Sequence, residues 1–133
     1  MADMIRHMES LDRILVVEDE PTLCAFLAEL LGSRYTVECV GSAEAALQFI
    51  AHSPPALVLC DVSLPHVSGL ELLAQLRGNA ATAQVPVILM SGSHDEVEEL
   101  AHKAGAVAFL PKPFQIPQVL SSVSAFAARP CPT

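Results

Sequence analysis

The chain of 133 residues has no tryptophan, few aromatic residues and few basic residues. Aromatic residues make up 5% of the sequence, so the core of a folded domain must be mainly aliphatic. Lys and Arg number 7 against 15 Asp and Glu, which gives a formal net charge of -8. This balance argues against a nucleic-acid-binding surface, which would be basic. It suits a protein that meets cations or basic partner surfaces.

Signals for membranes, secretion and zinc are also missing. No apolar segment approaches the roughly 20 residues needed to span a membrane. Residues 1–12 carry acids and bases instead of the apolar stretch of a signal peptide, so we expect a flexible leader there. The four cysteines show neither the CxxC spacing nor the nearby histidine pair of a zinc site. We expect reduced thiols in a cytoplasmic protein at Cys24, Cys39, Cys60 and Cys131.

Apolar, strand-like runs alternate with helical patterns along most of the chain. Strands are predicted over residues 13–17, 35–40, 56–61, 85–90 and 106–110, and helices over 21–31, 43–52, 69–77, 94–104 and 115–128. This alternation with short connections predicts an α/β fold, a doubly wound (βα)5 sandwich with helices on both faces of a five-stranded parallel sheet. No internal repeat or linker is visible, so residues 13–128 are predicted to form one domain and residues 129–133 a tail.

The third predicted strand carries the most informative residue of the chain. Its apolar run continues without alternation from Ala56 to Cys60, as in a strand buried on both faces, and ends in Asp61. A carboxylate inside such a run would be costly to bury without a partner. At the carboxyl end of a parallel strand, Asp61 projects where ligands bind in open α/β sheets. The sequence therefore predicts a functional site at Asp61.

Other predicted strands end in side chains that complement Asp61. Glu18 and Asp19 follow the first strand, Ser91 follows the fourth and Lys112 follows the fifth. Three close carboxylates repel one another and raise at least one pKa unless a cation joins them. An oxygen-rich acidic cluster of this kind suits Mg²⁺, which often bridges to phosphate. A divalent cation and Lys112 would balance the three negative charges.

Four short motifs stand at these strand ends: Val17–Asp19, Cys60–Pro65 with Gly69, Met90–Gly92 and Phe109–Phe114. In this order they resemble the bacterial two-component response-regulator receiver domain, of the chemotaxis-regulator type, over residues 13–128. The resemblance implies a flavodoxin-like sheet with the strand order 2-1-3-4-5. It also implies a phosphoacceptor signalling domain, not an enzyme with a separate substrate. Such a domain takes a phosphoryl group from a phosphohistidine of a sensor histidine kinase or a histidine phosphotransfer protein.

The resemblance assigns roles to individual residues. Asp61 would be the phosphoacceptor. Asp19, Asp61 and the backbone carbonyl of Ser63 would coordinate Mg²⁺, and Glu18 would act directly or through a water. Glu18 stands where the family more often has Asp, which adds one methylene group. Lys112, with the metal, would neutralise charge that develops on the phosphoryl oxygens.

Two further residues would convert phosphorylation into a changed surface. Ser91 would hydrogen-bond a phosphoryl oxygen, and Phe109 would turn inward as the loop of Ser91 shifts. Both have a simpler interpretation, Ser91 as a cap of the following helix and Phe109 as an ordinary core residue. Ser63 and Ser93 occupy positions that tune the lifetime of the phosphorylated state in the family. The Lys112–Pro113 peptide bond would be cis.

The predicted last helix has no charged residue from Ile116 to Ala128, whereas a solvated helix normally has a charged outer face. We therefore expect the face of the fourth helix, fifth strand and last helix to dock a downstream protein or a second copy of the chain. No contact with nucleic acid or a membrane is expected. Two other functions are considered: a pseudo-receiver that only binds proteins, and a flavodoxin-like enzyme or cofactor binder. The retained acidic residues argue against the first, and the lack of a glycine-rich loop after the first strand argues against the second.

Overall fold

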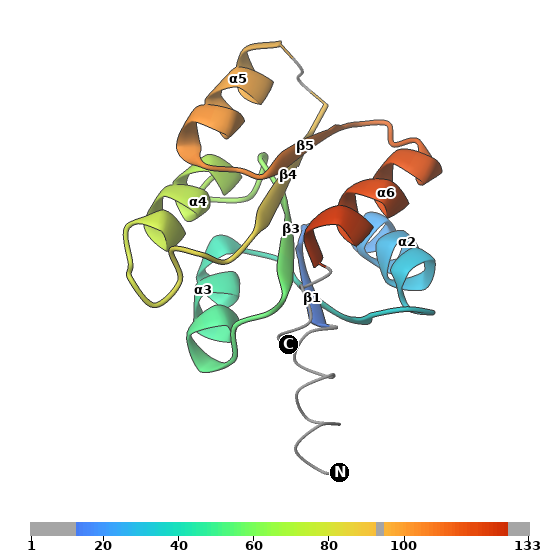
Figure 1. Cartoon of the computed structure of the whole chain (residues 1–133), viewed down its shortest axis with the longest axis horizontal. Helices are drawn as coiled ribbons and strands as arrows, with labels where there is room; N and C mark the ends of the chain where they lie inside the picture. The colour runs from blue at the N-terminus through green and yellow to red at the C-terminus, as the bar shows by residue number, and fades with distance from the viewer. Residues whose placement is uncertain (1–12, 93–94, 128–133) are drawn as a thin grey trace, which may run out of the picture.

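The computed structural model describes residues 13–92 and 95–127 (Figure 1). The strands are β1 (Arg13–Val17), β2 (Thr36–Val40), β3 (Leu57–Asp61), β4 (Val87–Ser91) and β5 (Ala108–Pro111). The helices are α2 (Pro21–Leu31), α3 (Ala43–His52), α4 (Gly69–Arg77), α5 (Asp95–Ala104) and α6 (Ile116–Ala127). The predicted leader over residues 1–12 and the tail over 129–133 lie outside the described residues.

The five strands form one parallel sheet in the order β2-β1-β3-β4-β5. Helices α2 and α6 cover one face of this sheet, and α3, α4 and α5 cover the other (Figure 1). The predicted fold class, strand order and two-sided helix cover are therefore confirmed. No helix in the described part of the chain is long and apolar enough to cross a membrane.

Two aliphatic layers, one on each face of the sheet, form the core. Because β3 and β4 are central, their residues are buried on both faces, which explains their unbroken apolar sequences. β2 lies at an edge and keeps exposed and half-buried residues, as its alternating sequence predicts. The largest fully buried side chains are all Leu or Ile, as the shortage of aromatic residues requires: Ile14, Leu15, Leu27, Leu31, Ile50, Leu57, Leu59, Leu72, Leu73, Leu76, Ile88 and Leu89.

The helix starts follow their sequence signals. Pro21 is the first residue of α2, where its missing N–H costs no intrahelical hydrogen bond. Ser42 accepts a hydrogen bond from the backbone N–H of Ala45 at 3.1 Å and caps α3. Ser68 caps α4 in the same way through the N–H of Glu71, at 3.2 Å. These caps place the helix N-termini directly after the loops that leave the strand ends.

Strands β4 and β5 each begin two residues later than predicted. The N–H of Val85 is bonded to the carbonyl of Thr82 at 3.1 Å, inside the turn that precedes β4. The N–H of Ala106 is bonded to the carbonyl of Ala101 at 3.0 Å, at the end of α5. Apolar residues at these two positions are buried, but their backbone closes the preceding element and does not join the sheet.

Candidate functional site

The carboxyl ends of the strands bring the predicted site residues to one edge of the sheet. Glu18 and Asp19 follow β1, and Asp61 is the last residue of the adjacent strand β3. Ser91 is the last residue of β4, and Lys112 comes directly after β5. Ser93 lies outside the described residues. The topology therefore collects side chains that are up to 94 positions apart in the sequence.

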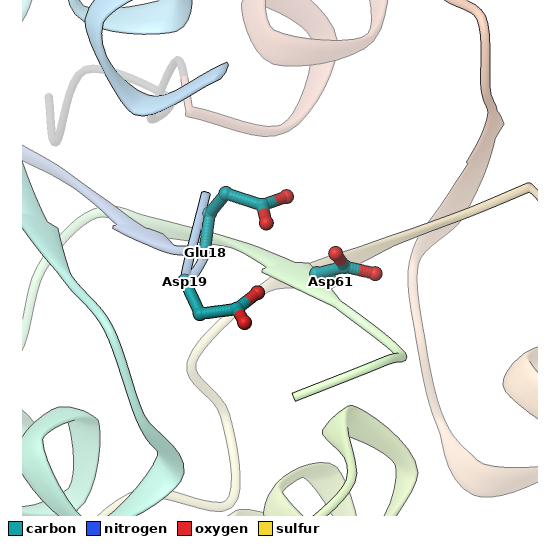
Figure 2. A group of neighbouring side chains, drawn as sticks. All are labelled: Glu18, Asp19 and Asp61. Carbon is teal, nitrogen blue, oxygen red and sulfur yellow. The ribbon is translucent and has the colours of Figure 1, made fainter. Parts of the chain in front are cut away.

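Three carboxylates meet at this edge. One oxygen each from Glu18, Asp19 and Asp61 lies within 4.8 Å of the other two. Figure 2 shows these side chains extending from the neighbouring strand ends with their carboxylates turned toward one another. Glu18 and Asp61 are buried, whereas Asp19 is exposed. Carboxylate oxygens in such a partly open cluster are suitable ligands for a hard divalent cation that keeps several waters.

Lys112 binds the two buried carboxylates. Its Nζ lies 2.8 Å from Oδ2 of Asp61 and 3.0 Å from Oε1 of Glu18. The longer side chain at position 18 thus reaches the lysine as well as the acidic cluster. The second oxygen of Glu18 accepts the backbone N–H of Glu20 at 3.2 Å. Three carboxylates and one ammonium leave two negative charges, which matches the charge of a divalent cation.

Burial and the neighbouring charges shift two pKa values at the site. The pKa of Glu18 is raised, mainly because burial disfavours its charged form, although the bond to Lys112 acts in the opposite direction. Burial acts to lower the pKa of Lys112, but the bonds to Asp61 and Glu18 and their charges outweigh it, so this pKa is raised. Lys112 is therefore held firmly as an ammonium group between two acids.

The loop after β3 fixes Asp61 from the backbone side. The N–H of Ser63 donates to Oδ1 of Asp61 at 3.0 Å. The N–H of Gly69, the first residue of α4, donates to the carbonyl of Val62 at 2.9 Å. A Cβ on Gly69 would lie 2.3 Å from the carbonyl oxygen of Asp61, so only glycine allows α4 to begin this close to the strand.

The loop after β5 is fixed in a similar way. The N–H of Lys112 donates to the carbonyl of Ser91 at 2.8 Å, which joins the two predicted phosphate-binding residues through the backbone. The Lys112–Pro113 peptide bond is cis, as the family resemblance implies. Ser91 is buried, at 4% exposure. Phe109 is also buried and belongs to the core layer on the side of the sheet covered by α3, α4 and α5, so it already points inward in this structure.

Sequence reasoning missed two arrangements, one at the opposite edge of the sheet and one beside the site. Arg77 donates to the carbonyls of Gly105, Ala83 and Val85 at 2.8–3.2 Å, and thereby connects the end of α4 to the loops before β4 and β5. The thiol of Cys24 donates to the carbonyl of Glu18 at 3.4 Å. Neither contact has a signal in the sequence, because the partners lie on separate elements.

The fold and this acidic edge together define a doubly wound α/β domain with three carboxylates, suited to a metal ion, at the carboxyl ends of its strands. Comparison with known proteins identifies the family: residues 14–124 match the response regulator receiver domain, and the chain belongs to that family. It is therefore a receiver domain of two-component systems, and the cluster of Glu18, Asp19 and Asp61 fits the site of a phosphoacceptor aspartate.

Individual relatives agree with this assignment. A crystal structure described as that of "a putative response regulator from Chloroflexus aurantiacus" has a TM-score of 0.84 and 31% identity, covering 89% of this chain and 98% of that one. The receiver domain of the sensor histidine kinase PA1611 from Pseudomonas aeruginosa, solved with magnesium in its active-site cleft, has the same fold at 24% identity, with a TM-score of 0.80 and coverage of 87% and 97%.

A Vibrio cholerae protein named "Probable cyclic di-GMP phosphodiesterase" is 38% identical over 119 residues, which are 87% of this chain and 27% of that protein. Other curated relatives, such as the response regulator ArlR of Staphylococcus epidermidis, are covered over 52% of their length. The chain therefore spans about half or less of the curated relatives that it matches.

Proposed function

We propose that Asp61 is the phosphoacceptor and takes a phosphoryl group from a phosphohistidine of a sensor histidine kinase or a histidine phosphotransfer protein. The observation that supports this most directly is the 2.8 Å contact of Asp61 with Lys112, beside the acidic pair that follows β1. A carboxylate buried at a strand end, with an ammonium group and a cation site next to it, is arranged to react and not merely to cap a turn.

In the proposed reaction, an oxygen of Asp61 attacks phosphorus and the bond from phosphorus to the histidine nitrogen breaks. Negative charge spreads over the phosphoryl oxygens. Lys112 neutralises part of this charge, because its ammonium group already lies beside the attacking carboxylate. Ser91 donates its hydroxyl hydrogen to a phosphoryl oxygen once the bond has formed. The N–H of Ser63 keeps the other oxygen of Asp61 in place.

Glu18, Asp19 and Asp61, with the backbone carbonyl of Ser63, would hold Mg²⁺. When bound, Mg²⁺ supplies further positive charge against the phosphoryl oxygens. The donor set supports this, because it contains only oxygen atoms and includes the exposed Asp19, which leaves room for water ligands. The magnesium ion in the receiver domain of PA1611 is consistent with the same choice of metal.

The output of the domain is proposed to pass through Ser91 and Phe109 to the face formed by α5, β5 and α6. Helix α6 has no charged residue, and large apolar side chains are exposed on α5 (Leu100) and on α6 (Ile116 and Phe126). Such side chains favour docking of a downstream protein or of a second copy of the chain. The exposed Leu120 of α6 lies instead beside Leu30 and Tyr35, on the side of α2. The small side chains at Ser63 and Ser93 are proposed to set the lifetime of the phosphorylated state.

The decisive experiment is to incubate the chain with Mg²⁺ and acetyl phosphate and to measure its intact mass. Wild type is expected to gain one phosphoryl group, and Asp61→Ala none. Glu29→Gln serves as a control, because it removes an exposed carboxylate of α2 that is not part of the site, so it should still be labelled. Persistent labelling of Asp61→Ala would reject the phosphoacceptor assignment, and an unlabelled wild type would indicate a pseudo-receiver that acts only through protein contacts.

Phosphotransfer assays with candidate kinases would then identify the phosphoryl donor. The protein itself is expected to be cytoplasmic. Sedimentation with and without beryllofluoride, an acyl-phosphate mimic, tests the α5–β5–α6 face. A dimer that forms only with beryllofluoride would support association of two copies. A monomer under both conditions would leave the downstream protein as the occupant of this face.

A further inference from the structure

Two thiols lie together where helix α2 meets the edge strand β2. Cys24 is in the first turn of α2, and Cys39 is 15 positions further along the chain, on β2. The thiol of Cys39 donates to the carbonyl of Cys24 at 3.7 Å, and after burial it is the next cause of the raised pKa of the Cys24 thiol. Both are free thiols. The structure thus pairs two cysteines from different elements without joining them.

The exposure of the two residues differs in a way that sets the order of any reaction. Cys39 is exposed, because β2 is the outermost strand of the sheet. Cys24 is half-buried and its thiol donates to the carbonyl of Glu18 at 3.4 Å. A reagent in solution is therefore expected to react with Cys39 first. Cys24 is less accessible and lies in contact with Cys39.

The third described cysteine provides a contrast within the same fold. Cys60 is fully buried in β3, and its thiol donates to the carbonyl of Asp61 at 3.3 Å. Burial raises the pKa of the Cys60 thiol and also that of the Cys24 thiol, the latter to about 12, so the contrast between them is one of access and not of thiolate content. No reagent can reach Cys60 without unfolding of the sheet, which makes it an internal control for chemistry at the exposed pair.

We propose that Cys24 and Cys39 are a site of reversible oxidation, at which a disulfide joins α2 to β2. In the first step, the thiolate of Cys39 attacks a low-molecular-weight disulfide such as oxidised glutathione, forms a mixed disulfide and releases one glutathione thiol. The thiolate of Cys24 then attacks the sulfur of Cys39 and releases the second. The two cysteines lose two protons and two electrons, and oxidised glutathione gains them.

The bond would form beside the segment that carries the acidic pair. The N–H of Glu18 donates to the carbonyl of Val40, the residue after Cys39, at 2.9 Å. Oxidation replaces the hydrogen of the Cys24 thiol, and the carbonyl of Glu18 loses that donor. The proposal depends on the thiol geometry alone and stands whether or not Asp61 is phosphorylated.

The test uses the full chain with Cys60→Ala and Cys131→Ser, which leaves only the proposed pair. The folded protein is treated with oxidised glutathione, and remaining thiols are blocked with N-ethylmaleimide before tryptic digestion. Cleavage places one cysteine in the peptide of residues 14–34 and the other in that of residues 35–77. Non-reducing mass spectrometry is expected to find these two peptides linked, and dithiothreitol is expected to separate them.

Two results would overturn the proposal. One is a stable glutathione adduct on Cys39 while Cys24 is recovered with N-ethylmaleimide, because the second step would then not occur. The other is a disulfide between two chains, detected as a dimer without reductant. The Cys24→Ser variant should stop at the glutathione adduct, and wild-type Cys60 should react with N-ethylmaleimide only after unfolding.

Discussion

Replacement of Gly69 by alanine tests the steric basis of the site. The new Cβ would lie 2.3 Å from the carbonyl oxygen of Asp61 and 2.9 Å from Cα of Val62, and both atoms belong to the backbone. An ordinary contact begins near 3.4 Å, so α4 and the end of β3 must separate by about 1 Å. Such overpacking lowers the free energy of unfolding by about 3 kcal/mol. The higher helix propensity of alanine compared with glycine offsets at most about 1 kcal/mol of this loss.

The net loss of about 2 kcal/mol corresponds to a decrease in melting temperature of roughly 6–10 °C for a domain of this size. Thermal unfolding followed by circular dichroism measures it, and labelling by acetyl phosphate should slow because Asp61 is displaced. Gly41→Ala is the matched control, since nothing lies within 4 Å of its new Cβ, and should change stability by less than about 0.5 kcal/mol. Equal melting temperatures of Gly69→Ala and Gly41→Ala would refute the claim that a Cβ at position 69 clashes with the backbone of Asp61.

Three further substitutions test the charges and the framework. Lys112→Met leaves two buried carboxylates without their counter-ion, so the free energy of unfolding in urea without metal should fall by about 2–3 kcal/mol. Addition of Mg²⁺ should stabilise this variant more than it stabilises the wild type. The raised pKa of Glu18 means that the folded state keeps a proton that the unfolded chain releases near pH 4.5. Stability without metal should therefore fall as pH rises from about 4.5 through the raised pKa, and Glu18→Gln should flatten that part of the curve; equal slopes would reject the burial argument. Arg77→Lys should lower the free energy of unfolding in urea by about 2 kcal/mol, because an ammonium group cannot replace a guanidinium group that is bonded to three carbonyls. A decrease below about 0.5 kcal/mol would contradict this reasoning.

The grouping of the candidate site residues could be predicted from the sequence because these residues stand at strand ends. Once the alternation of strands and helices is accepted, a parallel sheet must place all carboxyl ends along one edge. Glu18, Asp61 and Lys112 could therefore be brought together without knowledge of any contact between them. The same logic placed β2 at an edge, because its sequence alternates where those of β3 and β4 do not.

Contacts between separate elements could not be predicted in this way. The pairing of Lys112 with Glu18, and not only with Asp61, depends on the length of one side chain and on the path of the loop after β5. The bonds of Arg77 end on backbone carbonyls, which every residue possesses, so no residue type marks them. The proximity of Cys24 and Cys39 depends on how α2 packs against β2. Hydrophobic periodicity does not specify this packing.

The double role of Lys112 connects the stability of the domain to its proposed reaction. Without a metal, Lys112 is the cation that makes burial of Glu18 and Asp61 tolerable. Burial acts to lower the pKa of Lys112, but its contacts with these two acids raise it. A divalent cation held by Glu18, Asp19 and Asp61 would take over part of that neutralisation, so Lys112 would no longer have to remain between Glu18 and Asp61. Its ammonium group, which lies 2.8 Å from Oδ2 of Asp61, would then be available to a phosphoryl oxygen attached there. A surface lysine would have no such dependence on the metal, because its charge would be solvated in both states.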